Sequence, residues 1–484
     1  MITVYMPFSG IQETEQTINQ LKSSGLVSKI YLLSNSEIKE IPAGCEVMII
    51  ENITSSKTIS SIINTCSAPY FLFLTQNSQY QFGQFALERF FNVIDSTKAA
   101  MVYSNHFTTK DDSVVRHPVN DYQLGSLRDD FDFGPVFILN TGLCKKLNNI
   151  EELKFAGLYE LRLHLSTMGK FIRIPEFLYT TIEIDTRKSG AKQFDYVDPK
   201  NRDAQIEMEK VVTEHLKKIN AYLAPGFKEI LIENDEFQFD ASVVIPVKNR
   251  ASTISDAINS VLSQKTKYNF NLIVVDNYSD DGTTEKIKSI AEKDSRLIHL
   301  IPERRDLGIG GCWNEALSHN KCGRFAIQLD SDDIYADENT IQVIVDKFLE
   351  EKCAMVIGSY KMTNFNLEEI PPGLIDHKEW TPDNGRNNAL RINGLGAPRA
   401  FYTPILRDKK IPNVSYGEDY AVGLMISREY QIGRIYDPIY LCRRWEGNSD
   451  AALDIDKLNS YNEYKDRIRT IEVIARQGIN KNAG

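Results

Sequence analysis

Three carboxylates follow directly on a short apolar segment in Phe325 to Asp333, which has the sequence FAIQLDSDD. Like charges as close as those of Asp330, Asp332 and Asp333 raise one another's pKa, so the cluster persists only if solvent or a bound cation compensates it. Carboxylate oxygens suit Mg²⁺ or Mn²⁺, which keep water and substrate phosphate as further ligands. The motif predicts a metal and phosphate site. The alternative is a solvated acidic turn that caps the next helix.

Two other segments have residue types that suit a ligand site. In Leu272 to Thr283 (LIVVDNYSDDGT), a predicted strand ends at Asp276, whose carboxylate could accept a hydrogen bond from a nucleobase or a ribose. A turn or helix-capping role for Asp276 is the alternative. Asp306 to Asn314 (DLGIGGCWN) places three glycines before a helix, which permits close backbone approach to a ligand. It matches neither GxxxxGK[ST] nor GxGxxG, so alone it is weak evidence.

Alternating strands and helices position these motifs. The sequence predicts strands at 242–247, 271–276, 297–301 and 325–329, and helices at 253–264, 283–294, 311–318 and 338–350. This alternation is typical of βαβ units with a mostly parallel sheet. Ligands of such sheets bind beyond the carboxyl ends of the strands, where the acidic motif is predicted to lie.

The first half of the chain repeats the pattern with different chemistry. CSAPYFLFLTQNS (66–78) aligns with KCGRFAIQLDSDD (321–333), and YELRLHLSTMGKFIRIPEFLY aligns with YAVGLMISREYQIGRIYDPIY. These matches indicate an internal duplication. Under this alignment Thr75 stands for Asp330, Asn77 for Asp332, and Leu158 for Asp419. The second copy is therefore the one predicted to be catalytic.

Composition limits the class of protein. A chain of 484 residues is expected to form two or three domains. Its formal charge of -10 argues against nucleic-acid binding by bulk electrostatics. The seven cysteines are scattered without a CxxC pair, which favours reduced thiols in a cytoplasmic protein. The start of the sequence does not resemble a signal peptide, and no apolar run approaches the roughly 18 residues of a membrane span, so we expect at most peripheral membrane contact.

Five motifs occur in order: VVIPVKNR, VVDNYSDDGT, GIGGCWNEAL, LDSDD and YGEDYAVG. Together they resemble the family 2 glycosyltransferases, inverting enzymes of the nucleotide-diphospho-sugar transferase (GT-A) fold. The resemblance spans about 241–449, with a degenerate echo over 1–190. It implies an α/β protein with two tandem GT-A-like domains, mixed and mostly parallel sheets flanked by helices, and a C-terminal helix. The expected ranges are a non-catalytic domain at 1–190, a helical linker at 191–238, a catalytic domain at 239–453 and a helix at 454–484.

The resemblance also implies roles for individual residues. Asp330 and Asp332 match the DxD motif, which holds the donor ribose and a divalent cation, and Asp276 matches the contact to the base. Asp419 matches the general base that deprotonates the acceptor hydroxyl. The implied donor site consists of Pro246, Val247, Asn249, Arg250, Asp276, Asn314, Asp330 and Ser331.

The sequence departs from the family pattern at three positions. Asn277 stands where many members have a second aspartate, Trp313 where arginine is frequent, and Trp445 where a histidine is frequent. The last change leaves a third metal or diphosphate contact without its usual histidine, and Arg443, Arg444 or Glu446 could serve instead; a solvated strand end is the alternative for the two arginines. Further candidates for the acceptor or the diphosphate are Glu418, Trp380 and Arg399, with helix capping as the alternative for Glu418 and packing roles for the other two.

The sequence therefore predicts a metal-dependent, inverting glycosyltransferase that uses Mn²⁺ or Mg²⁺. It would transfer a hexosyl or N-acetylhexosaminyl group from a nucleoside-diphosphate sugar, with uridine as the commonest base in the family, to a glycan or lipid-linked saccharide. The alternatives are a non-catalytic sugar-binding or scaffolding protein and a nucleotidylyltransferase, although 246–250 lacks the glycine-rich basic loop of the latter. The predicted helix at 453–477 could pack on the first domain, form a homo-oligomer contact or lie on a membrane; its mixed charge favours packing.

Overall fold

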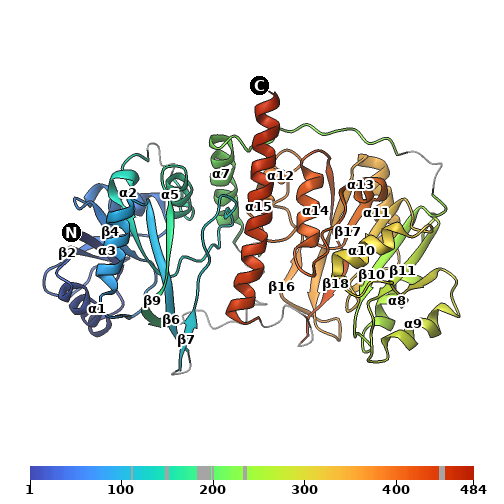
Figure 1. Ribbon diagram of the computed structural model, residues 1–484, viewed down its shortest axis with the longest axis horizontal. Coiled ribbons are helices and arrows are strands. Elements are labelled where there is room, and N and C mark those ends of the chain that lie inside the picture. Colours follow the sequence, from blue (N-terminus) through green and yellow to red (C-terminus); the bar gives the residue numbers. More distant parts are fainter. Residues whose placement is uncertain are drawn as a thin grey trace. The chain divides into compact units, whose positions relative to one another are not determined.

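The computed structural model describes residues 1–110, 113–147, 152–182, 198, 201–232, 237–445, 448 and 453–483. The chain divides into two compact units (Figure 1). The first unit comprises Met1–Lys188, Asp203–Tyr222 and Leu453–Gly484, and the second comprises Ser189–Arg202 and Leu223–Ala452. These ranges differ from the expected separate linker and separate C-terminal helix, because the helices of both segments pack within the first unit.

Figure 1 labels many of the elements of both units. Those of the first unit are β1 (Ile2–Pro7), α1 (Ile11–Ser23), β2 (Val27–Ser34), β3 (Cys45–Ile49), α2 (Ser56–Thr65), β4 (Tyr70–Leu74), β5 (Tyr80–Phe82), α3 (Ala86–Thr97), β6 (Met101–Lys110), β7 (Ser113–His117), β8 (Val136–Asn140), α4 (Thr141–Cys144), α5 (Gly157–Ser166), β9 (Phe171–Ile182), α7 (Arg202–Lys218) and α15 (Ile455–Ala483). Those of the second unit are β10 (Ala241–Val247), α8 (Ile254–Leu262), β11 (Phe270–Asp276), α9 (Thr283–Ala291), β12 (Leu297–Leu300), α10 (Ile309–Ser318), β13 (Phe325–Gln328), β14 (Ile334–Tyr335), α11 (Thr340–Glu351), β15 (Met355–Thr363), β16 (Glu369–Ile375), α12 (Gly385–Asn388), β17 (Arg399–Tyr402), α13 (Thr403–Lys409), α14 (Glu418–Ser427) and β18 (Ile432–Arg443).

The two sheets have the same strand order. It is β3-β2-β1-β4-β8-β6-β9-β5 in the first unit and β12-β11-β10-β13-β17-β15-β18-β14 in the second. In each unit one more strand, β7 or β16, pairs with β6 or β15. The central strands β1 and β10 run parallel to their neighbours, whereas β8 and β17 are antiparallel to theirs. The expected fold class, tandem α/β units with mixed sheets, is confirmed.

Helices cover both faces of each sheet because side chains of a buried strand alternate between the faces. In the first unit, Val4 of β1 belongs to a core with α1 and α3, and its neighbour Tyr5 belongs to a core with α2 and α5. In the second unit, Ala400 of β17 shares a core with α8 and α11. Its neighbour Phe401 faces the other way and contacts Trp313 of α10 edge-on, with ring centroids 5.8 Å apart.

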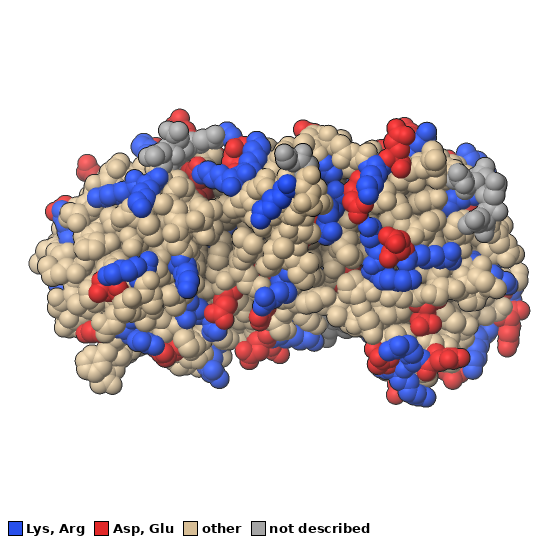
Figure 2. Space-filling model, turned by 45° about the horizontal axis from the view of Figure 1, so that its top comes forward, with Lys and Arg blue, Asp and Glu red and all other residues tan. Residues whose placement is uncertain are grey.

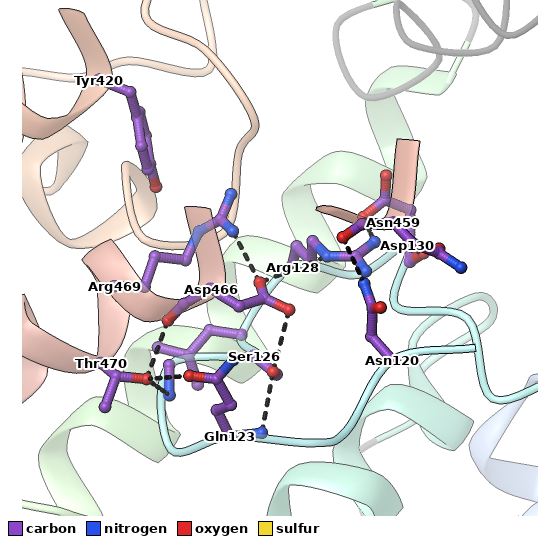
Figure 3. A network of polar contacts seen from close by, with 12 residues as sticks. Asn120, Gln123, Ser126, Arg128, Asp130, Tyr420, Asn459, Asp466, Arg469 and Thr470 are labelled. Atoms are coloured by element: carbon purple, nitrogen blue, oxygen red, sulfur yellow. Dashed lines mark hydrogen bonds and ion pairs between the residues drawn. The ribbon is translucent and has the colours of Figure 1, made fainter. Parts of the chain in front are cut away.

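The C-terminal helix α15 is anchored in the first unit by a buried polar network (Figure 3). Asp466 accepts a hydrogen bond from the hydroxyl of Ser126 at 3.0 Å and pairs with Arg469 at 2.9 Å and Arg128 at 3.4 Å. These three charged side chains are at most 3% exposed. Of the roles considered for this helix, packing on the first domain is therefore the one that the structure contains.

On the face shown in Figure 2, basic and acidic side chains are interspersed, and charges of one sign form no broad area. In the part of the chain that the structure describes, no helix combines the length and the apolar character needed to cross a lipid bilayer.

Candidate active site of the second unit

The carboxyl ends of three parallel strands meet at one edge of the second sheet. In the register of β10 and β11, Val247 lies beside Asp276, and in that of β10 and β13, Val244 lies beside Gln328. The turn that follows β13 is closed by a hydrogen bond from the Asp333 amide to the Asp330 carbonyl at 3.2 Å. This edge is where open α/β sheets bind their ligands.

Asp330 is held by its neighbour on β13. The side-chain amide of Gln328 donates to Asp330 Oδ1 at 2.8 Å, and its oxygen accepts from the backbone amide of Arg399 at 3.0 Å. Although the side chain of Asp330 is exposed, the surrounding protein reduces the hydration of its carboxyl and raises its pKa, which Arg399 opposes. The negative charges of Asp332 and Asp419 raise that pKa further.

Asp332 receives hydrogen bonds on one oxygen. Its Oδ2 accepts from Asn448 Nδ2 at 3.1 Å and from the indole N–H of Trp445 at 3.3 Å, and Arg250 Nε lies 3.9 Å away. Trp445, which stands where the family pattern has a histidine, thus contacts the second carboxylate of the acidic motif. Its indole is a hydrogen-bond donor to the carboxylate, since an indole nitrogen has no lone pair for a metal.

Asp333 and Arg443 brace the acidic turn. Asp333, only 5% exposed, accepts hydrogen bonds from the hydroxyl of Tyr440 at 2.8 Å and the amide of Arg443 at 2.7 Å. Burial, with the nearby Asp332 charge, raises the pKa of Asp333 well above its usual range. Arg443 donates through Nε to the Asp332 carbonyl at 2.5 Å and pairs with Asp256 at 2.8 Å. Both side chains therefore hold the turn, and Nη2 of Arg443 has no hydrogen-bond partner among the described residues, which do not include Glu446.

The first turn of α14 contributes the other carboxylates. Gly417, with a φ of 76°, has the left-handed backbone that favours glycine and directly precedes Glu418 and Asp419. Arg399 Nη1 lies 2.9 Å from Asp419 Oδ2 and donates to the Gly396 carbonyl at 2.7 Å. Burial and the neighbouring Asp419 raise the pKa of Glu418 to about 8. Glu418 is therefore mostly protonated at neutral pH.

The proposed base-contacting carboxylate is already hydrogen-bonded. Asp276 accepts from the Ser279 amide at 3.0 Å, the Thr284 hydroxyl at 2.5 Å and His299 at 3.3 Å. Burial alone would raise the pKa of Asp276, but the hydrogen bonds from His299, Thr284 and Ser279 outweigh it and lower that pKa. These contacts fit the turn alternative and fix the carboxylate at the strand end beside Val247.

The loop that follows β10 is held by hydrogen bonds to the turn that follows β11. Asn249, with a φ of 54°, accepts a hydrogen bond from the Asp280 amide at 3.0 Å. The backbone amide of Arg250 donates to the Thr283 hydroxyl at 2.8 Å, which leaves its guanidinium beside Asp332. Pro246, half-buried, precedes this loop on β10.

Other candidates have structural contacts. Asn314 exchanges hydrogen bonds with the backbone of Ile411 at 2.7 and 3.1 Å. Trp380 is buried against Gly385, where an added Cβ would lie 2.5 Å from the ring. The Arg444 amide donates to the Thr363 carbonyl at 2.7 Å, and the Ser331 carbonyl accepts from Thr253 at 2.8 Å. Packing or positioning roles fit these contacts.

A divalent cation fits the two carboxylates of the motif. Asp330 and Asp332 each retain one oxygen that accepts no hydrogen bond from the described residues. Within those same residues, no group of three or more His, Cys, Asp or Glu side chains is placed to hold a metal by itself. A cation here would complete its shell with phosphate oxygens and water, as Mg²⁺ and Mn²⁺ do.

Three contributors to the site were not predicted from the sequence: Gln328, Tyr440 and Asn448. Gln328 carried a signal, because a polar residue interrupts an otherwise apolar strand just before the acidic turn. Tyr440 and Asn448 reach the turn from more than 100 positions away, and no local pattern marks them.

Comparisons with known proteins agree on a family. The model of "Glycosyl transferase family 2" matches residues 242–409. A 237-residue stretch is 36% identical to the UDP-Glc:alpha-D-GlcNAc-diphosphoundecaprenol beta-1,3-glucosyltransferase WfgD of Escherichia coli, covering 48% of this chain and 84% of that protein. The poly(ribitol-phosphate) beta-glucosyltransferase of Bacillus spizizenii is 24% identical over 238 residues, 48% of this chain but 36% of its own length.

Two further similarities are more limited. An uncharacterized glycosyltransferase of Rickettsia felis is 38% identical over 220 residues, which are 45% of this chain and 35% of that protein. The crystal structure of S. aureus TarS residues 1–349 in complex with UDP-GlcNAc matches with a TM-score of 0.38 and 22% identity, covering 49% of this chain and 72% of that one.

Proposed function

Because the chain belongs to glycosyl transferase family 2, we propose that its second unit transfers a sugar, with inversion, from a nucleoside-diphosphate sugar to a glycan or lipid-linked saccharide. That it is a glycosyltransferase follows from the family; the donor, the acceptor and the roles of individual residues are the proposal. One observation carries it: Asp419, paired with Arg399, joins Asp330 and Asp332 in one cluster at the carboxyl edge of the sheet.

A uridine diphosphate sugar is the proposed donor. The Escherichia coli relative is named for UDP-glucose and for a diphosphoundecaprenol-linked acceptor. In this chain the diphosphate would bind near Asp330 and Asp332, with Arg250 available beside Asp332 as a cationic contact. The nucleoside would lie along the ends of β10 and β11, between Val247 and the loop that Asn249 orders.

Asp330 and Asp332 are the proposed holders of Mn²⁺ or Mg²⁺. When bound, such a cation neutralises the charge that develops on the diphosphate leaving group. The contribution of the chain is to fix the two carboxylates: Gln328 orients Asp330, and Trp445 and Asn448 orient Asp332. Donors of this kind around a metal ligand set its orientation and tune its affinity.

Asp419 is the proposed general base. Displacement at the anomeric carbon needs a base that takes the proton of the acceptor hydroxyl as the new bond forms. The guanidinium of Arg399 lies beside the carboxylate of Asp419 and favours its ionised form, and a protonated Glu418 adds no negative charge next to it. A single displacement of this type inverts the anomeric centre.

The scaffolding alternative fits the first unit better than the whole chain. At the positions equivalent to Asp330, Asp332 and Asp419, that unit has Thr75, Asn77 and Leu158. It therefore lacks the carboxylates proposed for the metal and the base. We propose that the complete protein works on the cytoplasmic side of a membrane-linked acceptor, with the first unit as a non-catalytic partner domain.

A panel of sugar nucleotides with Mn²⁺ or Mg²⁺ tests the donor assignment through the release of nucleoside diphosphate. Wild type should turn over one donor with a requirement for metal, and Asp332→Ala should abolish release. The duplicated unit supplies a matched control, since Asn77→Ala changes the equivalent position and should leave release unchanged. Equal loss in both variants, or release that persists in Asp332→Ala, would rule out this site. Release of pyrophosphate from nucleoside triphosphates would instead favour a nucleotidylyltransferase.

A further inference from the structure

An exposed phenylalanine lies one side chain away from the acidic turn of the second unit. Phe365 follows β15 at the tip of the hairpin that β15 forms with β16, and it is 39% exposed. Its ring contacts the ring of Trp445 edge-on, with centroids 5.3 Å apart, and the indole N–H of Trp445 donates to Asp332. Single exposed aromatic residues are common on protein surfaces. What distinguishes Phe365 is its position beside a proposed metal ligand.

The turn that contains Phe365 is fixed by hydrogen bonds. The side-chain oxygen of Asn364 accepts from the amides of Asn366 and Glu368 at 2.9 and 3.0 Å. The guanidinium of Arg443 lies over the ring of Phe365, 4.7 Å from its centroid, and Arg443 is itself only 3% exposed. The ring is therefore ordered before any ligand arrives, which reduces the entropy lost on binding.

Phe365 lies on the side of the acidic turn away from the proposed nucleoside site. In the strand order β11-β10-β13-β17-β15, the nucleoside is proposed at β10 and β11, and Phe365 follows β15 on the other side of β13. Both β13 and β15 are antiparallel to β17, so they run parallel to each other and end at the same edge of the sheet. Arg399, the partner of Asp419, belongs to β17 between them. The proposed general base and Phe365 thus share the side that the donor base leaves open.

An exposed aromatic ring in this place suits a saccharide. The C–H groups on one face of a pyranose ring carry partial positive charge, and the face of an aromatic ring is negative. A sugar that stacks on an exposed ring keeps its hydroxyl groups in water, so none is buried without a partner. Trp380, the aromatic acceptor candidate from the sequence, is only 5% exposed and does not offer a ring in this way.

We propose that Phe365 is the platform of an acceptor subsite, on which a pyranose ring of the acceptor saccharide stacks. The proposal rests on the proposed sugar transfer and defines the substrate class on the acceptor side. The acceptor has at least one pyranose ring with an unhindered C–H face. A linear polyol has no such fixed face and binds less tightly.

Saturation-transfer NMR of the full chain with UDP and Mg²⁺ tests this subsite. The probes are methyl β-D-glucopyranoside, whose axial C–H groups form an apolar face, and sorbitol, which has hydroxyl groups but no ring. Wild type should bind the glucoside at least fivefold more tightly, roughly the size of one aromatic contact. Phe365→Ala should abolish this preference, and Phe365→Tyr, which keeps the ring, should retain it. Equal binding of the two probes to wild type, or a preference that survives in Phe365→Ala, would overturn the proposal.

Two further measurements separate the platform from a packing role. Phe85→Ala, at a phenylalanine of the first unit that is 66% exposed, should leave both affinities unchanged. Release of nucleoside diphosphate from the donor to water needs no saccharide acceptor, so Phe365→Ala should keep it within twofold of wild type. Lost glucoside binding in Phe85→Ala, or lost release in Phe365→Ala, would overturn the platform role. Glucoside binding that depends on Phe365 in a chain that turns over no donor would support the subsite and contradict the proposed function.

Discussion

The Nη1 atom of Arg399 lies 2.9 Å from Oδ2 of Asp419, and the same nitrogen donates to the Gly396 carbonyl at 2.7 Å. The guanidinium therefore connects the proposed base to a fixed point of the backbone. It is also the positive charge that opposes the raised pKa of Asp330. Arg399 is thus placed to orient Asp419 and to reduce repulsion among the carboxylates.

We predict that Arg399→Leu lowers kcat for sugar transfer at least tenfold, because Asp419 loses both its orientation and its compensating charge. Arg399→Lys keeps a charge without the planar fork and should recover part of the loss. Steady-state kinetics with varied donor checks this. The exposed Arg304, which pairs with Asp306 at the surface, provides the control in Arg304→Leu. A kcat within twofold of wild type in Arg399→Leu would refute the role.

Trp445→Phe should raise the Mn²⁺ concentration for half-maximal activity about tenfold, the size expected when a donor to a metal ligand is removed. The substitution deletes the indole N–H on Asp332 but keeps an aromatic ring against Phe365, whose centroid lies 5.3 Å away. Metal titrations of activity measure the effect. Trp380→Phe, at a buried tryptophan beside Gly385, should leave the metal requirement unchanged; an equal shift in both variants would indicate a general packing effect instead.

Most of the fold can be predicted because the sequence contains two copies of one pattern of strands and helices, and each copy supports the interpretation of the other. The strands predicted at 242–247 and 271–276 are found at Ala241–Val247 and Phe270–Asp276, and the two copies share one strand order. The edge strands Tyr80–Phe82 and Ile334–Tyr335 were not predicted, since two or three residues are too short to show a period of two. Their partners come from distant parts of the chain, so only the folded sheet defines them.

The candidate site likewise has parts that the local sequence predicts and parts that only the folded chain defines. The acidic turn and the Glu418–Asp419 pair can be found from local motifs, and the structure brings Asp330, Asp332 and Asp419 together. The local sequence does not reveal that Asp333 and Arg443 are used to brace the turn. The bracing role of Asp333 depends on its burial and on the hydrogen bond from Tyr440, which lies 107 positions away in the sequence.

Asp466→Ala should lower the free energy of unfolding of the first unit by about 3–5 kcal/mol, because it leaves the buried Arg128 and Arg469 without their shared carboxylate. Urea unfolding followed by circular dichroism measures this. Asp130 is a matched control, since it also pairs with Arg128, at 2.8 Å, but is half exposed. Asp130→Ala should cost no more than about 1 kcal/mol. Similar costs for both variants would contradict the importance of burial in anchoring α15.

Acid should destabilise the first unit through His106. This side chain is 2% exposed, stacks on Tyr179 and His117, and has a pKa lowered to about 4, chiefly by burial. In the unfolded chain, His106 therefore takes up a proton near pH 6.5, whereas in the folded chain it takes up this proton only near pH 4. Stability is complete above this window and falls as the pH decreases through it, by up to about 3 kcal/mol.

His106→Phe preserves the stacking and removes the titration. Its free energy of unfolding should vary less between pH 7 and pH 4.5 than that of wild type, in urea titrations at each pH. An unchanged pH slope would mean that His106 is not held neutral in the folded unit.

The most direct test of the account is a single-turnover measurement of sugar transfer by Asp419→Asn at a donor concentration that saturates binding. Asparagine has nearly the same shape but cannot accept the hydroxyl proton, so we predict a rate at least 100-fold below wild type, with donor affinity within about threefold. A transfer rate within tenfold of wild type would contradict the assignment of Asp419 as the base and, with it, the proposed mechanism of the second unit.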